Sequence, residues 1–113
     1  MENRLSHRDF AEQLNKNFTL QLEGRDPIEM ELVDVSELLL TSQQERFAII
    51  FRKPGPEVLP QRIYSVANAD IGITDLFLVP VKQESDAVYY EAIFNRFAKK
   101  PEVVAGVTSA EED

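Results

Sequence analysis

The apolar residues of this chain recur mainly at every second position, which is the pattern of β-strands that bury one face. Residues 18–23 (FTLQLE) and 28–32 (IEMEL) both alternate in this way, and the turn sequence GRDP lies between them. After Leu32 the alternation slips, because Val33 and Val35 become the apolar positions. A β-bulge would account for this slip and would help the strand to bend. The pattern therefore predicts two strands, with a bulge near Leu32.

Two further strands flank a proline-rich connection. Residues 46–52 (RFAIIFR) are apolar nearly throughout, which predicts a strand buried on both faces. Residues 54–62 (PGPEVLPQR) lack a backbone donor at each of three prolines, so we expect a stiff surface loop. Residues 63–69 (IYSVANA) then predict a fourth strand, in which Tyr64 and Val66 point inward.

Residues 75–95 follow a turn near Gly72 and predict a β-hairpin, because two apolar runs flank the polar sequence KQESDA. Pro80 cannot donate to a ladder, so its part of the strand is expected at an edge or a bulge. Leu76 and Leu78 are expected on the second side of that strand, which is also covered. The face shared across the hairpin is predicted to contain Phe77, Val79, Val81, Tyr90, Ala92 and Phe94.

The first residues predict a short helix. Ser6 and Asp9 have the spacing of a capping box, and Phe10, Ala11 and Leu14 share one helical face. The helix, at about residues 7–15, is too short to persist alone and is expected to dock over an end or an open edge of the sheet. We therefore predict an all-β fold of about six antiparallel strands, a small barrel or a sandwich, with one short N-terminal helix.

One domain is expected over residues 1–97, because 113 residues suffice for one core but not for two of ordinary size. Residues 98–113 (AKKPEVVAGVTSAEED) have no periodic pattern and end in an acidic cluster, so a disordered tail is expected. No apolar run approaches the roughly 20 residues that span a bilayer, and no apolar leader is present at the start. We expect no membrane association, and a location in the cytoplasm or within a virion-like particle.

The charge of the chain argues against nucleic acid as a partner. It carries 20 acidic and 12 basic residues, a formal net charge of -8, and phosphate binding needs a basic stripe that the sequence lacks. The chain also has no cysteine, which excludes disulfides, thiolate nucleophiles and zinc–thiolate sites. Packing alone must therefore hold the fold together.

Candidate catalytic and metal-binding residues are few. His7 could act as a general base, but no nucleophile or carboxylate pattern points to it, and a solvent-facing helix residue is the plainer interpretation. Glu29, Glu31 and Asp34 could offer oxygen ligands to calcium, yet their spacing fits no EF-hand and equally describes a solvated strand face. Glu84 and Asp86 in the hairpin turn are interpreted in the same way. The four glycines are isolated, so no phosphate-binding loop is expected. We predict no catalytic residue, no cofactor and no metal ligand.

Tyr89 and Tyr90 are adjacent and must point to opposite faces of a strand. If Tyr90 is in the core, Tyr89 is either at an interface or a cross-strand filler. The residues that we single out as candidates for an interface are Pro54, Pro56, Pro60, Pro80 and Tyr89.

Three segments carry a resemblance to a known family. Residues 18–38, 47–72 and 76–95, including LVDV, LPQ, LFLVPV and YEAIFN, resemble a family of small bacterial domains of uncharacterised function. Arg62 stands where that family has glycine. Members often accompany phage-tail-collar-type proteins, and the resemblance implies a structural or assembly role with a protein partner.

The function expected from the sequence is a non-enzymatic structural or protein-interaction module, with a component or assembly factor of a phage-tail-like particle as one candidate. Exposed strand edges can pair with another chain, so a homo-oligomer is a second expectation. Two alternatives stay open. One is a small-molecule-binding β-barrel or minor enzyme that uses the barrel mouth. The other is a calcium-dependent module.

Overall fold

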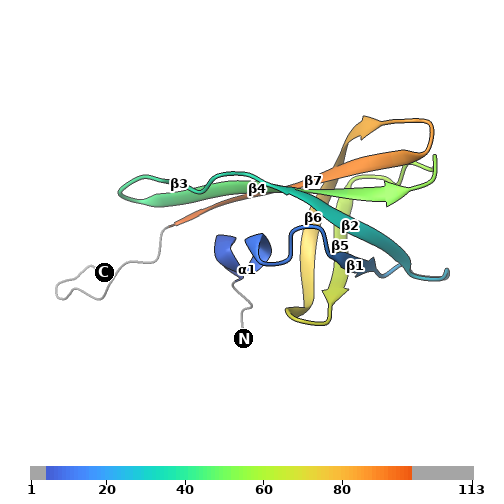
Figure 1. The fold of residues 1–113 in the computed structure, drawn as a ribbon, viewed down its shortest axis with the longest axis horizontal. Helices are drawn as coiled ribbons and strands as arrows, with labels where there is room; N and C mark the ends of the chain where they lie inside the picture. Colours follow the sequence, from blue (N-terminus) through green and yellow to red (C-terminus); the bar gives the residue numbers. More distant parts are fainter. Residues whose placement is uncertain (1–4, 98–113) are drawn as a thin grey trace.

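The computed structural model describes residues 5–97, and it shows a closed antiparallel barrel (Figure 1). Six strands follow the order β2-β1-β5-β6-β7-β4, and β2 also pairs with β4, which closes the barrel. The elements are α1 His7–Ala11, β1 Asn17–Leu20, β2 Ile28–Val35, β3 Leu39–Leu40, β4 Gln44–Pro54, β5 Arg62–Asn68, β6 Gly72–Gln83 and β7 Ala87–Phe97. The predicted all-β class with one short helix is confirmed, as a barrel. The prediction for residues 98–113 falls outside the described residues.

Side chains at alternate strand positions fill the barrel. Phe18 and Leu20 of β1 and Met30 and Leu32 of β2 are buried, as the alternation predicts. In β5, Tyr64 and Val66 point inward as expected. The strand β4 differs from the prediction: its odd-numbered positions from 47 to 53 are buried, whereas its even-numbered positions are only half-buried. Its second face is therefore partly open to solvent and not fully covered.

The bulge predicted in β2 is present. The pairing between β2 and β4 shifts between Leu32 and Asp34, so Val33 is the extra residue. Leu32 lies opposite Phe51 and Asp34 lies opposite Ile50. The change of apolar phase in the sequence is thus the direct mark of this bulge.

The hairpin of β6 and β7 is confirmed, but the predicted face of β6 is wrong. Leu76 and Leu78 are buried, whereas Phe77 and Val81 are 51% and 49% exposed. The cause is a second bulge, because Pro80 lies opposite Tyr90 while Lys82 lies opposite Tyr89. Val81 is the extra residue, and it reverses the faces of the residues that precede it. In a ladder without the bulge, Phe77, Val79 and Val81 would lie opposite Phe94, Ala92 and Tyr90, on the shared face that the sequence predicts.

The helix α1 begins as predicted and ends earlier. The Ser6 hydroxyl accepts a hydrogen bond from the Asp9 N–H at 3.1 Å, and the Asp9 carboxylate accepts one from the Ser6 N–H at 2.8 Å. After Ala11 the chain turns to run beside β2, where the Asn15 N–H donates to the Leu32 carbonyl. Of the predicted apolar face only Phe10 is buried; Ala11 and Leu14 are exposed.

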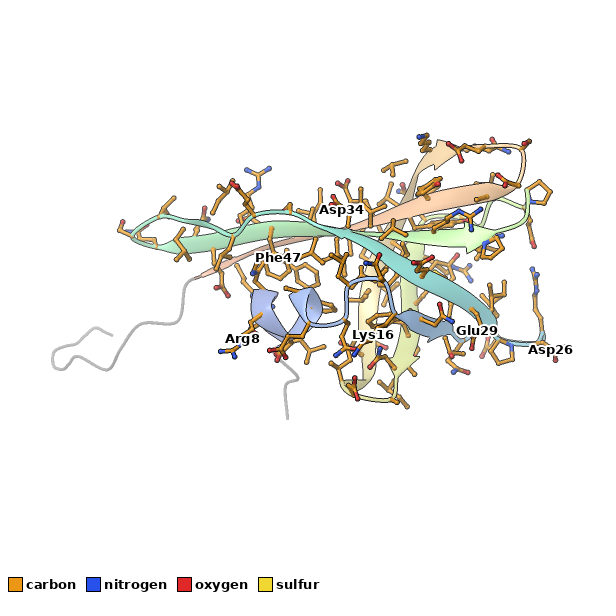
Figure 2. The ribbon with its side chains drawn as sticks, viewed as in Figure 1. Arg8, Lys16, Asp26, Glu29, Asp34 and Phe47 are labelled. Atoms are coloured by element: carbon orange, nitrogen blue, oxygen red, sulfur yellow. The ribbon has the colours of Figure 1, made fainter. Side chains whose placement is uncertain are left out.

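An aromatic cluster holds α1 against the sheet. Phe47 of β4 points toward α1 (Figure 2), and its ring stacks on that of Phe94 with centroids 4.6 Å apart. The Phe10 ring lies 5.2 Å from that of Phe94. His7 places its ring edge-on to Phe47 at 5.1 Å, and its Nε2 donates to the carbonyl of Ser36 at 2.8 Å. His7 is therefore half-buried in a packing role, which differs from the solvent-facing residue expected.

Beyond the barrel, β4 and β7 continue as a paired extension, visible at the left of Figure 1. The sequence analysis missed β3, a two-residue strand that pairs with β4 along this extension. Leu39 and Leu40 are both exposed, so no burial pattern marks the strand.

Candidate functional site

The barrel interior is packed with apolar side chains. Phe18 of β1 and Phe51 of β4 meet edge to face with centroids 5.1 Å apart, and both are fully buried. Leu20, Leu32, Ile49, Val66, Leu78 and Val88 belong to the same core. The hollows described below all lie on the surface of the barrel.

One end of the barrel is closed by the proline-rich loop. The N–H of Leu59 donates to the Tyr90 hydroxyl at 2.8 Å, and the Tyr64 hydroxyl donates to the carbonyl of Pro60 at 2.5 Å. Leu59 is buried beneath the loop, whereas Pro54, Pro56 and Pro60 are exposed. The loop is thus tied down by two tyrosines and presents its prolines to solvent, as predicted for a stiff surface loop.

A buried lysine lies under this loop. Lys53 is 2% exposed, and its Nζ donates to the carbonyl of Pro54 at 3.1 Å. Burial lowers the pKa of Lys53; the Glu57 carboxylate opposes this and the Arg25 guanidinium adds to it. The sequence reasoning missed Lys53, because a lysine near a strand end ordinarily reaches solvent.

Arg25 and Glu57 form a two-pronged ion pair across the same end, with N–O distances of 2.8 and 2.9 Å. Hydrogen bonding to Glu57 raises the pKa of Arg25, and hydrogen bonding to Arg25 lowers the pKa of Glu57. The pair joins the turn between β1 and β2 to the proline-rich loop. Because both side chains are exposed to solvent, this ion pair contributes little to the stability of the fold.

The two tyrosines that hold the loop, Tyr64 and Tyr90, both have raised pKa values. Burial of each hydroxyl is the main cause. The Leu59 N–H partly offsets this at Tyr90, because a donor favours the phenolate. Tyr90 is a neutral phenol that accepts a hydrogen bond from the Leu59 N–H, and Tyr64 is a neutral phenol that donates one to the Pro60 carbonyl.

Of the predicted interface residues, only Pro80 lines the hollow that lies beside the proline-rich loop. Pro80 and Val58, which belongs to the proline-rich loop, line one hollow of about 260 Å³ with residues of the β6–β7 hairpin. The loop and the hairpin are also joined by the Gly55 N–H, which donates to the Asp86 carbonyl at 2.8 Å. Pro80 is half-buried at the bulge.

Tyr89 lies apart from this hollow, on the outer face opposite Lys82. The Lys82 ammonium sits 5.3 Å from its ring centroid, and the Tyr89 hydroxyl donates to the Glu84 carboxylate at 3.4 Å. Tyr89 is half-buried by its own hairpin. Tyr89 thus packs across the strand pair against Lys82, and a role for it at an interface stays a prediction.

The acidic residues do not converge. Asp34 and Glu29 lie toward opposite ends of β2 (Figure 2), and Glu84 and Asp86 form ion pairs with Lys82 and Arg52. Within residues 5–97 no three acidic or histidine side chains come together as a metal-binding group.

A surface that the sequence analysis did not predict lies on the outer side of β5, β6 and β7. Ile63 pairs with Phe77 across β5 and β6, and they are 66% and 51% exposed. Phe77 and Val79 line a hollow of about 320 Å³ together with Glu91 and Ile93, and Ile93 is 60% exposed. We call Ile63, Phe77, Val79 and Ile93 the outer patch. The signal that could have revealed it is Pro80, because a bulge at that proline turns Phe77 and Val79 outward.

Comparison with known proteins adds a family and no activity. Among the residues that the structure describes, no helix has the length and apolar character needed to cross a bilayer. A search of the curated proteins and a search of the solved structures each found no match. A family described as a domain of unknown function, DUF6916, matches residues 5–94, which include every element of the barrel except the last three residues of β7. The chain belongs to the DUF6916 family.

Proposed function

We propose that this protein is a non-enzymatic interaction module that binds another protein through the outer patch. The observation that carries the proposal is the exposure of Ile63, Phe77 and Ile93, at 66%, 51% and 60%, on one pleated face where Phe77 and Ile93 line a hollow and Ile63 lies opposite Phe77. Such side chains expose on the order of 300 Å² of contiguous apolar surface, a size that is often functional in a monomeric protein. A partner that covers this surface removes it from water.

The packing of the barrel supports binding on the outside. Its interior is occupied by aromatic and aliphatic side chains, and the hollows described lie between strands and loops at the surface. Small ligands bind mostly in enclosed clefts with a few converging polar groups. The open apolar surface of the outer patch suits a macromolecular partner better.

The biological setting that we propose is a phage-tail-like particle, in which the domain serves as a component or an assembly factor. The support for this setting is the resemblance of the three segments described above to domains that accompany tail-collar-type proteins. A tightly packed domain with an exposed apolar face suits an assembly role.

The proposal is tested by capture from the native host with matched variants. The double variant Phe77→Ser with Ile93→Ser removes the outer patch, and Leu39→Ser with Leu40→Ser removes two exposed leucines on β3 as the control. We expect a partner that is retained by the parent chain and the β3 variant to be lost from the outer-patch variant. Equal retention by all three chains would refute the proposal, provided that their melting curves agree.

A further inference from the structure

The strands β6 and β7 pair along only part of their length. Their ladder runs from Val79 to Gln83 on β6, and β6 pairs with β5 from Gly72 to Leu78. The strand β7 pairs with β4 along its whole length, from Ala87 to Phe97. Beyond Val79 and Glu91 the two strands diverge, as Figure 1 shows where β6 descends and β7 continues along the extension.

The divergence leaves one edge of each strand outside any ladder that the described residues form. Within residues 5–97, the edge of β6 from Thr74 to Leu78 and the edge of β7 from Ala92 to Arg96 have no partner in any strand ladder. Unpaired edges present rows of backbone N–H and C=O groups, and an extended chain can add to them. We call this region the split.

The hollow of the outer patch lies where the split begins. Its floor is formed by Phe77 and Val79 from β6 and Ile93 from β7, with Glu91 at the point of divergence. One apolar side chain from an added strand would therefore enter the hollow, while its backbone met an open edge. Side chains two residues apart on that strand would point to the same outer side.

Carboxylates flank the split. Asp75 and Glu91 occupy outward positions, and neither takes part in an ion pair or a side-chain hydrogen bond within the described part of the chain. Two outward bases nearby, Lys82 and Arg52, are already paired with Glu84 and Asp86. The free charge beside the apolar floor is thus negative, which matches a basic side chain on the occupant.

We propose that the split binds an extended segment of a partner protein in which an apolar residue lies two positions from a lysine or arginine. The apolar side chain enters the hollow between Phe77 and Ile93, and the basic side chain reaches Asp75 or Glu91 according to strand direction. This inference rests on the proposed interaction function and specifies the chemistry of the partner.

The test uses the full isotope-labelled chain and short synthetic peptides with blocked ends, in which Val-x-Lys stands in a serine–threonine background. Amide shifts in a titration report both affinity and location. Asp75→Asn with Glu91→Gln removes the carboxylates of the split. Asp34→Asn with Glu29→Gln removes two exposed carboxylates of β2, labelled in Figure 2, and changes the net charge equally.

We expect the peptide to perturb amides of residues 74–78 and 92–96, and the split variant to bind it about fivefold more weakly. The β2 variant should change the affinity less than about twofold, because its charges are remote. A peptide with glutamate in place of lysine should bind the parent chain more weakly than the Val-x-Lys peptide binds the split variant. Equal weakening in both variants, perturbations located elsewhere, or a self-associating chain whose amides shift at the split would overturn the inference.

Failure of this inference is distinguishable from failure of the proposed function. If the Phe77 and Ile93 variant loses its partner in capture while the carboxylate variant keeps it, the outer patch still binds protein. The basic, extended character of the partner would then be wrong.

Discussion

The hydroxyl of Tyr90, in the strand β7, accepts a hydrogen bond from the backbone N–H of Leu59 at 2.8 Å. Both residues are buried, so this bond joins the proline-rich loop to the core and satisfies a donor that no water reaches. The loop that the Tyr90 hydroxyl holds in place carries three exposed prolines. The conformation of the loop therefore depends on a residue more than thirty positions away in the sequence.

Replacement of Tyr90 by phenylalanine is expected to destabilise the protein by about 1–3 kcal/mol, because the Leu59 N–H would lose its acceptor in a buried place. Chemical denaturation followed by circular dichroism measures the change. Tyr89→Phe is the matched control, since the Tyr89 hydroxyl makes only a long hydrogen bond of 3.4 Å near the surface. It should cost about 0.5 kcal/mol or less. Equal losses in the two variants would contradict the role given to Tyr90.

Replacement of Lys53 by methionine is expected to stabilise the protein at neutral pH by about 1 kcal/mol, because it removes a poorly compensated buried charge. Burial lowers the pKa of Lys53 from its ordinary 10.5, so the unfolded chain binds this proton more tightly than the folded chain does. The unfolding free energy of the parent protein therefore rises with pH between the folded pKa and 10.5, and is unaffected by this group below that interval.

The advantage of the Lys53→Met variant should accordingly be greatest near neutral pH and shrink as the pH approaches 10.5. Denaturation of both proteins at several pH values measures this difference, and contributions from other groups cancel. Lys16→Met serves as the control, because Lys16 is exposed and its ion pair with Asp70 spans 3.6 Å. A Lys53→Met protein that is less stable than its parent at neutral pH would show that the buried ammonium is well compensated.

Because adjacent residues of β6 lie on opposite faces, substitutions at Leu78 and at Phe77 should differ sharply in their cost to stability. Leu78→Ala should cost about 2–5 kcal/mol, because Leu78 is fully buried and its truncation leaves a cavity. Phe77→Ala should cost about 1 kcal/mol or less, although it removes a larger side chain, since Phe77 is 51% exposed. Thermal and chemical unfolding of the two variants measure the order. The reverse order would support the face assignment predicted from the sequence, in which Phe77 points toward the core.

Arg96 is expected to matter beyond its charge. It pairs with Glu45 at 2.9 Å, with both side chains about one-fifth exposed, and its guanidinium lies 5.7 and 5.4 Å from the ring centroids of Phe47 and Phe94. It also donates to the carbonyl of Leu5, which precedes α1. Arg96→Met should therefore cost about 1–3 kcal/mol, as unfolding curves would show.

The control for this variant is Arg8→Met, since Arg8 makes a comparable contact with Glu12 at 3.1 Å while 86% of its side chain is exposed. Its loss should change stability by about 0.5 kcal/mol or less. A cost for Arg96→Met as small as this would mean that the aromatic cluster holds α1 without help from the guanidinium.

The features of the fold that could be predicted are those that leave a sign in the apolar periodicity or in the spacing of residues. The bulge in β2 was visible because polar and apolar residues change phase at Val33, and the capping box of α1 was visible in the spacing of Ser6 and Asp9. The bulge in β6 carries no such mark, since residues 76–79 are all apolar and either face reads as a core. Pro80 indicated where the bulge lies, but not which side chains of β6 it turns toward the core.

The site was less predictable than the fold. Lys53 is buried beneath the proline-rich loop, which begins at the next residue, and the strand pattern does not show whether that loop leaves the strand end open or covers it. The outer patch depends on which side of β6 faces water and on where β6 leaves β7. Both depend on tertiary structure. The bulge at Val81 decides the first, and the longer pairing of β7 with β4 decides the second.

Val81 is the one residue of β6 between Val79 and Gln83 that has no partner on β7. Its deletion would make Pro80 and Lys82 neighbours opposite Tyr90 and Tyr89 and would leave every other pair of the two strands in place. Leu76 would stay buried and Asp75 would stay exposed, because the alternation upstream of the deletion is unchanged. This segment of the barrel can therefore lose one residue without changing which side chains face the core.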